Sequence, residues 1–287
     1  MKAIYECAPC LLRQVIRVTS YATSDKTLQL KAIEKTFTKL NQYFNFNETP
    51  AALGTIVHRS INETLSNSDP YREEKRLSNI KAIELLPKVR SLMKNSANPF
   101  QIALKAAIAS NSVDFAVKGD YNIEAEFNKI LSEEFAINDS EIMASFLSNS
   151  KNLLYIFDNA AEIVFDYLLI EKIKKQFKIK VTGVVKGSPI LNDATLEDAY
   201  IARIPEIVDK LITIGTNTIG TILEECSSEF IQNFKLSDVI ICKGMGNYES
   251  LEDNPFRKKI IFILKAKCKP VASSLGVPLN SNVVKAI

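Results

Sequence analysis

Histidine is almost absent from this sequence, and its scarcity argues against several kinds of active site. His58 is the only histidine among 287 residues. Nucleophilic enzymes of the Ser-His or Cys-His kind need a histidine as the base beside the nucleophile. A mechanism of that kind is therefore disfavoured, and we expect His58 to be an ordinary, partly exposed helix residue.

Cysteine is also scarce, and only Cys7 and Cys10 form a C-x-x-C pair. One such pair, with no second histidine in the chain, does not complete the four ligands of a structural zinc site. The pattern favours reduced thiols packed at the start of a helix. It leaves open a redox pair, or a partial metal site that Cys226, Cys242 or Cys268 completes.

Long apolar runs and charge of one sign are missing as well. No stretch approaches the ~20 uninterrupted apolar residues of a membrane-spanning helix. The first residues, MKAIYECAPCLLRQVIRV, lack the basic, apolar and small-residue regions of a secretory signal. Lys and Arg number 36 against 33 Asp and Glu, a net charge of +3 that does not indicate a nucleic-acid surface. We expect a cytoplasmic protein without nucleic-acid or membrane partners.

Two regions with different patterns follow one another along the chain. Residues 1–95 have the three- and four-residue apolar spacing of helices, as in TLQLKAIEKTFTKLNQYFNF at 27–46. We predict a helical N-terminal region over 1–95 and an α/β domain over 96–287. After residue 150, short apolar runs alternate with amphipathic segments, the pattern of a parallel sheet wound with helices. The predicted strands are 153–157, 179–185, 211–214, 238–242 and 260–265, and the predicted helices lie near 160–176, 194–209, 218–233 and 247–254.

Polar side chains follow the ends of these predicted strands, where open parallel sheets bind ligands. Asp158 and Asn159 follow the first strand, and Asn192 and Asp193 follow the second. Asp158, Asn159 and Asp193 offer three oxygen ligands, which hard divalent ions such as Mg²⁺ and Mn²⁺ prefer. Such pairs are also common in turns and helix caps, so both interpretations stay open.

The fourth predicted strand leads into KGMGNYES, residues 243–250. Its lysine, its two glycines and the helix that follows are suited to binding an anion through backbone N–H groups. The segment is neither a Walker loop nor a dinucleotide fingerprint, because the required glycine spacing is missing. GTNTIGT at 215–221 offers similar groups, although a plain strand-to-helix loop fits it equally well.

Several of these stretches occur in the order typical of one family. They are CAPC, DPYREEK, SNSVDF, FDNAAEIVFD, KGSPILNDAT, KGMGNYESLED and ILKAKCKPVASSLGV. Over nearly its whole length the chain resembles the domain of unknown function 89 family of metal-dependent damage-control phosphatases, above all its cysteine-containing prokaryotic, largely archaeal branch. The resemblance implies a three-layer α/β/α sandwich with a mainly parallel sheet and a helical N-terminal region. It also implies an enzyme that hydrolyses phosphate monoesters of small metabolites, such as sugar phosphates or damaged phospho-metabolites.

The resemblance assigns site residues by position. It makes Asp158, Asn159 and Asp193 catalytic residues and the ligands of a divalent ion, Mn²⁺, Mg²⁺, Co²⁺ or Ni²⁺. The implied substrate or phosphate ligands are Asn111, Asp114, Lys243, Gly244 and Gly246, with Asn247 and Glu162 as weaker candidates. Ala161 and Ser110 stand where the family often has glycine, which bears on the range of substrates.

Other functions stay open beside the phosphatase. A protein that binds or senses phosphorylated metabolites without turnover would share the metal and the anion loop. Human relatives have been described as carboxyl methyltransferases, although nothing here resembles the glycine-rich loop expected for common methyl donors. A redox or metal-sensing centre at Cys7 and Cys10 is a third alternative.

Overall fold

The computed structural model describes residues 1–109, 123–256 and 258–287. Across these residues, seven strands form one sheet in the order β1-β7-β6-β5-β2-β3-β4. All neighbouring strands are parallel except β6 and β7, which are antiparallel. The strands are β1 (Phe135–Asn138), β2 (Asn152–Ile156), β3 (Lys180–Val185), β4 (Lys210–Thr213), β5 (Val239–Lys243), β6 (Ile260–Lys265) and β7 (Asn282–Ala286). The mainly parallel sheet confirms the predicted fold class.

The five predicted strands are present within one or two residues, whereas β1 and β7 were not predicted. β1 has four residues and alternates between half-buried and exposed positions at the edge of the sheet. β7 contains only a short apolar run at Val283 and Val284. Neither segment has the continuous apolar run that marks a strand buried on both faces.

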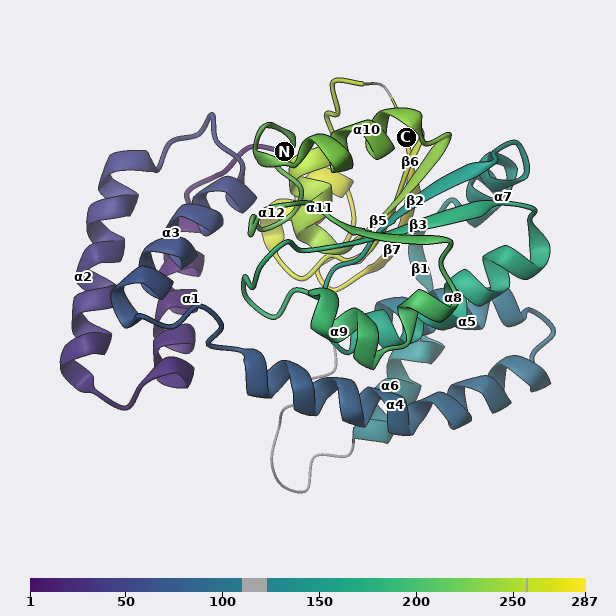
Figure 1. Cartoon of the computed structure of the whole chain (residues 1–287), viewed down its shortest axis with the longest axis horizontal. Coiled ribbons are helices and arrows are strands. Elements are labelled where there is room, and N and C mark those ends of the chain that lie inside the picture. Colours follow the sequence, from purple (N-terminus) through teal and green to yellow (C-terminus); the bar gives the residue numbers. More distant parts are fainter. Residues whose placement is uncertain (110–122, 257) are drawn as a thin grey trace.

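Side chains of each central strand alternate between two buried clusters, because successive residues of a strand point to opposite faces. Leu153 and Tyr155 belong to the cluster that contains α5 (Pro99–Ala109) and α8 (Glu162–Gln176). Leu154 and Ile156 belong to the cluster that contains α10 (Ser228–Leu236), α11 (Gly244–Leu251) and α12 (Lys269–Leu275). Helices therefore cover both faces, which confirms the three-layer sandwich (Figure 1).

The N-terminal helices occupy two places. α1 (Cys7–Ala22), α2 (Lys26–Tyr43) and α3 (Pro50–Leu65) pack together as a lobe beside the sheet (Figure 1). α4 (Arg72–Asn95) instead runs along the α/β part and contacts α5, α8 and α9 (Leu196–Ile201). The boundary between residues 95 and 96 stays a prediction. α6 (Ile123–Ser132) and α7 (Ser140–Ser148) contribute Leu131, Met143 and Leu147 to the buried cluster that contains α5 and α8.

The helix predicted over 218–233 is wrong for its first half. Residues 223–225 form one 3₁₀ turn, and α10 begins only at Ser228. Gly220 has a φ of +65°, and Thr218 and Thr221 are fully buried in an irregular loop. The predicted helix near 194–209 is shorter, because α9 ends at Ile201 and one 3₁₀ turn (Ile204–Glu206) follows. The predicted helix near 247–254 begins three residues earlier, at Gly244.

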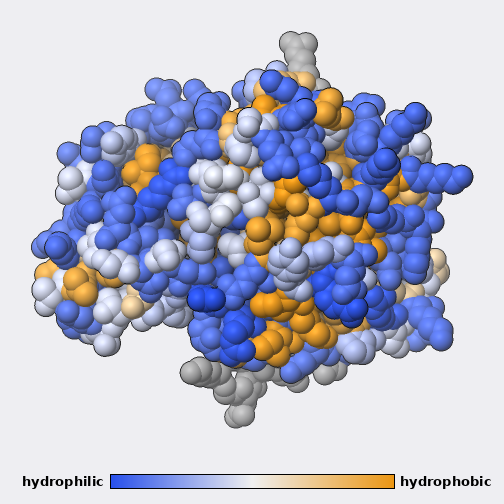
Figure 2. Space-filling view, in the orientation of Figure 1, coloured by the Kyte–Doolittle hydropathy of each residue, from blue (hydrophilic) through white to orange (hydrophobic). Residues whose placement is uncertain are grey.

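The surface of the molecule is mixed. Figure 2 shows that hydrophilic side chains cover most of this face, while hydrophobic ones gather over the α/β part on the right. Among the helices of the described residues, none is both long enough and apolar enough to cross a bilayer.

Candidate active site

The loops that follow β2 and β3 are joined to each other by backbone hydrogen bonds. The Ala194 N–H donates to the Asp158 carbonyl at 2.7 Å, and Asn159 and Asp193 form an isolated antiparallel bridge. Because β2 and β3 are parallel neighbours, their carboxyl ends meet at one edge of the sheet. The structure therefore brings together Asp158, Asn159 and Asp193, the three residues predicted as metal ligands.

The position of the Asp158 carboxylate depends on two neighbours. Asn159 Nδ2 donates a hydrogen bond to Asp158 Oδ2 at 2.6 Å. Gly244, the first residue of α11, has a φ of +77°, and a Cβ built there would stand 1.9 Å from Asp158 Oδ2. Only glycine leaves room for the carboxylate and adopts this backbone conformation without strain. The absence of a side chain at Gly244 thus allows the Asp158 carboxylate to occupy its position.

Asp193 is a buried carboxylate that is paired with Lys186. The residue is 4% exposed, and Lys186 Nζ lies 3.3 Å from Asp193 Oδ2. Burial raises the pKa of Asp193 to about 7, Lys186 opposes this rise, and the Asp158 carboxylate adds to it. Two carboxylates held together with little water repel each other in the absence of a cation.

These donors fit a hard divalent cation. Asp158 and Asp193 supply two carboxylates whose repulsion a dication would relieve, and Asn159 supplies an amide oxygen. Within the described ranges, no three His, Cys, Asp or Glu side chains group closely enough to hold a metal ion. The predicted trio contains only two such residues, so this finding does not bear on it. Asn111 and Asp114, also predicted for the site, lie outside the described residues.

Lys243, predicted to bind phosphate, is fully buried beneath the site. Its ammonium donates to the Ala107 carbonyl at 2.9 Å, to Asp166 Oδ1 at 2.7 Å and to Glu162 Oε1. Burial alone would lower the pKa of Lys243, but Asp166 and Glu162 outweigh it and raise the pKa above its ordinary value. The structure gives this lysine three partners inside the protein, and its role as a phosphate ligand stays a prediction.

Asn247 and Gly246 have different surroundings. Asn247 is buried, and its Nδ2 donates to the carbonyls of Phe157 and Lys243 at 3.3 and 2.8 Å. It therefore ties the end of β2 to the end of β5. Gly246 lies on the wall of a pocket in front of these strand ends.

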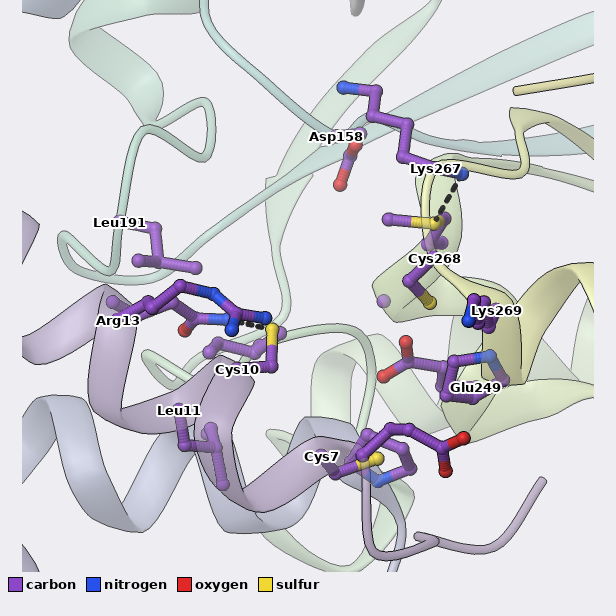
Figure 3. A pocket seen from close by; sticks show the side chains of 18 of the residues that line it. Cys7, Cys10, Leu11, Arg13, Asp158, Leu191, Glu249, Lys267, Cys268 and Lys269 are labelled. Carbon is purple, nitrogen blue, oxygen red and sulfur yellow. Dashed lines mark hydrogen bonds between the residues drawn. The ribbon is translucent and has the colours of Figure 1, made fainter. Parts of the chain in front are cut away.

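That pocket has a volume of about 650 Å³ and lies between the α1–α3 lobe and the α/β part. Asp158, Asn159 and Asp193 contribute to one side, and the first turns of α1 to the other. The cations on its wall are Arg13, Lys267 and Lys269. In Figure 3 the Lys267 side chain extends past Asp158. The pocket thus offers carboxylates for a metal ion and cations for an anionic substrate.

Ala161 lies in a strained turn at the start of α8. Its φ and ψ are +62° and −46°, and the Glu162 N–H donates to the Ala160 carbonyl at 2.8 Å. This is the γ-turn with positive φ, which is rare and strained for residues other than glycine. Asn79 Oδ1 accepts a hydrogen bond from the Ala161 N–H at 2.6 Å. The conformation accounts for a preference for glycine at this position.

His58 is not partly exposed, and that prediction is wrong. It is 1% exposed between α3 and α1, where Nε2 hydrogen-bonds to Gln14 Oε1 at 2.9 Å. Burial lowers the pKa of His58 to about 4, so the side chain is neutral. Asp166 of α8 is also buried, and it accepts hydrogen bonds from Lys243 and Tyr155.

Sequence reasoning missed several residues of the site. Lys186 had a usable signal, because Lys186 and Gly187 directly follow β3, and a similar Lys-Gly pair, Lys243 and Gly244, stands at the end of β5. Arg13, Glu249 and Lys267 had none, since they reach the pocket from segments far apart in the chain. The helix predicted to begin at the C-x-x-C pair is confirmed, with Cys7 as the first residue of α1.

Comparison with known proteins places this arrangement in a family. The damage-control phosphatase ARMT1-like domain matches residues 3–283. The chain belongs to this family. It is 44% identical to an uncharacterized protein of Methanocaldococcus jannaschii over 97% of this chain and 93% of the relative. A protein of Archaeoglobus fulgidus named damage-control phosphatase is 38% identical, with both chains covered completely.

Solved structures agree with this assignment to the ARMT1-like domain family. The crystal structure of a DUF89 family protein from Pyrococcus horikoshii superposes with a TM-score of 0.91 at 35% identity. The match covers 99% of this chain and 98% of that chain. The resemblance to the domain of unknown function 89 family is thereby confirmed.

Proposed function

We propose that the protein is a metal-dependent phosphatase, which hydrolyses phosphate monoesters of small metabolites such as sugar phosphates or damaged phospho-metabolites. The observation that carries the proposal is the meeting of Asp158, Asn159 and Asp193 at the wall of a pocket that also contains cations. Its family membership and a relative named damage-control phosphatase support the same reaction.

Phosphoryl transfer depends mainly on positioning and on neutralising the charge of the transferred group. A divalent ion such as Mn²⁺, Mg²⁺, Co²⁺ or Ni²⁺, held by Asp158, Asn159 and Asp193, would supply Lewis-acid polarisation of the phosphoryl oxygens. Asn159 orients Asp158 by donating to Oδ2, and Lys186 holds the Asp193 carboxylate in place. Asp158 must be ionised in this scheme, whether it binds the metal ion or attacks phosphorus.

The substrate would be held by cations of the pocket wall. Lys267 and Arg13 come from opposite sides of the pocket and carry positive charge where a phosphate would enter. Charge-assisted hydrogen bonds from such groups to phosphate oxygens are roughly twice as strong as neutral ones. The volume of about 650 Å³ suits a small metabolite rather than a polymer.

Replacing Asp158 tests the proposal. We expect Asp158→Ala to abolish phosphate release from p-nitrophenyl phosphate with Mn²⁺ or Co²⁺, while circular dichroism shows an intact fold. Asp253→Ala, which removes an exposed aspartate after α11, is the matched control and should keep wild-type turnover. Wild-type turnover in Asp158→Ala would refute the assignment.

A panel of metal ions and phosphorylated metabolites extends this test. The proposal expects phosphate release from at least one small phosphate monoester, and none after removal of divalent ions by chelation. A metal-dependent rise in melting temperature with sugar phosphates, without any phosphate release, would instead support the binder or sensor.

A further inference from the structure

Three cysteines line the pocket within the described residues, although the proposed phosphatase mechanism uses none of them. Cys7 and Cys10 lie in the first turn of α1, and Cys268 lies across the pocket at the residue before α12 (Figure 3). Cys226 and Cys242 lie elsewhere, and all five cysteines of the described chain are free. The structure thus selects Cys268 from the three candidates as the cysteine near the C-x-x-C pair.

The spacing of these thiols favours a redox pair over a metal site. Across the described residues, no three His, Cys, Asp or Glu side chains lie close enough together to form a metal site. Cys7 and Cys10 are three residues apart in a helix, and helix geometry separates their Cα atoms by about 5 Å. This separation falls within the range of roughly 4.4–6.8 Å found in disulfides. Side-chain rotation can therefore join the two sulfurs while the helix stays in place.

We propose that Cys7 and Cys10 are a redox-active dithiol in the wall of the catalytic pocket, which forms a reversible disulfide and weakens substrate binding. Cys10 is half-buried at the pocket, and its Sγ accepts a long hydrogen bond from Gln14 Nε2, at 3.5 Å. Cys7 also lines the pocket but is only 7% exposed. Cys10 is therefore the thiol that an oxidant meets first.

The oxidant in this scheme is a low-molecular-weight disulfide. The Cys10 thiolate attacks one of its sulfurs, which forms a mixed disulfide and releases the first small thiol. The Cys7 thiolate then displaces the second small thiol and forms the Cys7–Cys10 bond. Two protein thiols are oxidised, one small disulfide is reduced to two thiols, and the two cysteine protons end on those thiols.

Formation of the disulfide should change the shape of the pocket by disturbing the contact between α1 and α3. Turning Cys10 toward Cys7 breaks its contact with Gln14, whose Oε1 hydrogen-bonds to His58 Nε2 of α3 at 2.9 Å. These helices form one wall of the pocket, whereas Asp158, Asn159 and Asp193 follow strands of the sheet. We expect KM to change more than kcat. This consequence rests on the proposed phosphatase function, whereas the disulfide itself does not.

The experiment uses the full chain, reduced with dithiothreitol and then equilibrated in glutathione and glutathione disulfide. We expect free thiols to fall from five to three, peptide mapping to identify a Cys7–Cys10 bridge, and dithiothreitol to restore all five. For p-nitrophenyl phosphate, KM should rise about tenfold, less than the ~100-fold that a 1 Å displacement of reacting groups can cost.

Two variants sharpen the result. Cys10→Ser should keep the same KM in reduced and oxidised buffer, and Cys226→Ser, outside the pocket, should respond as the wild type does. Five thiols persisting under oxidation, a bridge that includes Cys268, or zinc retained in stoichiometric amount by the reduced protein would overturn the dithiol. A Cys7–Cys10 bridge with an unchanged KM would overturn the claim that the disulfide weakens substrate binding. If no phosphatase activity exists, the thiol count alone still decides the dithiol.

Discussion

The Asp158 carboxylate lies directly over the backbone of Gly244, so that a Cβ on Gly244 would stand 1.9 Å from Asp158 Oδ2. The end of β5 therefore fixes the side chain that follows the neighbouring strand β2. A residue eighty-six positions away in the sequence thus controls the geometry of the proposed metal ligand.

Gly244→Ala should therefore impair activity far more than stability. Displacing Asp158 by about 1 Å is expected to reduce kcat/KM by about 100-fold, measured on p-nitrophenyl phosphate with Mn²⁺. Gly276→Ala is the matched control, because Gly276 also has a positive φ of +70° but has no atom within 4 Å of the added Cβ. Both variants should lose about 1 kcal/mol of unfolding free energy from backbone strain. Equal activity in the two variants would contradict the role of Gly244.

Ala161→Gly should stabilise the protein. Relief of the strained γ-turn is worth about 1–3 kcal/mol, and the added chain entropy of glycine offsets about 0.5–1 kcal/mol of it. We expect a net gain of about 1 kcal/mol in urea denaturation. Ala160→Gly provides the comparison, since Ala160 is not among the residues with positive φ in the described chain and should lose stability on this change. Loss of stability in both variants would show that the turn at Ala161 is not strained.

The buried His58 should make stability depend on pH. Its pKa is lowered to about 4 in the folded protein, so between about pH 6.5 and pH 4 only the unfolded chain takes up the proton. The free energy of unfolding should fall in this range by roughly 3 kcal/mol more than in His58→Gln, which keeps a donor to Gln14 and does not titrate. Urea denaturation at a series of pH values measures the difference, and parallel curves for the two proteins would exclude His58 as its source.

Lys243 and Lys267 should behave in opposite ways. Lys243→Met leaves Glu162 and Asp166 buried without their cation, which should cost about 3–5 kcal/mol of stability at neutral pH. The cost should shrink at lower pH, because protonation removes the charge of the two carboxylates. Denaturation of Lys243→Met at several pH values tests both statements.

Lys267→Met should spare stability and weaken substrate binding, because this side chain is exposed on the pocket wall. Losing one charge-assisted hydrogen bond is expected to raise KM for a phosphate monoester about tenfold or more. Steady-state kinetics at saturating Mn²⁺ provide the measurement. An unchanged KM in Lys267→Met, together with a raised KM in a folded Lys243 variant, would show that Lys243 rather than Lys267 binds the substrate phosphate.

Local pattern was enough to predict much of the fold. Runs such as 153–157 and 260–265 are short and apolar on both faces, which is typical of strands that helices cover on both sides. The edge strand β1 and the turn at Gly220 were not predicted, because such short or irregular segments are stabilised by residues that are distant in the sequence. Lys186, for example, donates a hydrogen bond to the Gly220 carbonyl.

The sequence by itself determined the parallel α/β sheet, the family, and the placing of Asp158, Asn159 and Asp193 after strands, because strand periodicity and the order of motifs are local properties. Only the tertiary structure decided the surroundings of the lysines and the cysteines. It buried Lys243 with two carboxylates, placed Lys267 on the pocket wall, and brought Cys268 to the pocket opposite Cys7 and Cys10. Such pairings depend on which segments pack together, and the local sequence around each residue carries no signal of which distant segment it will contact.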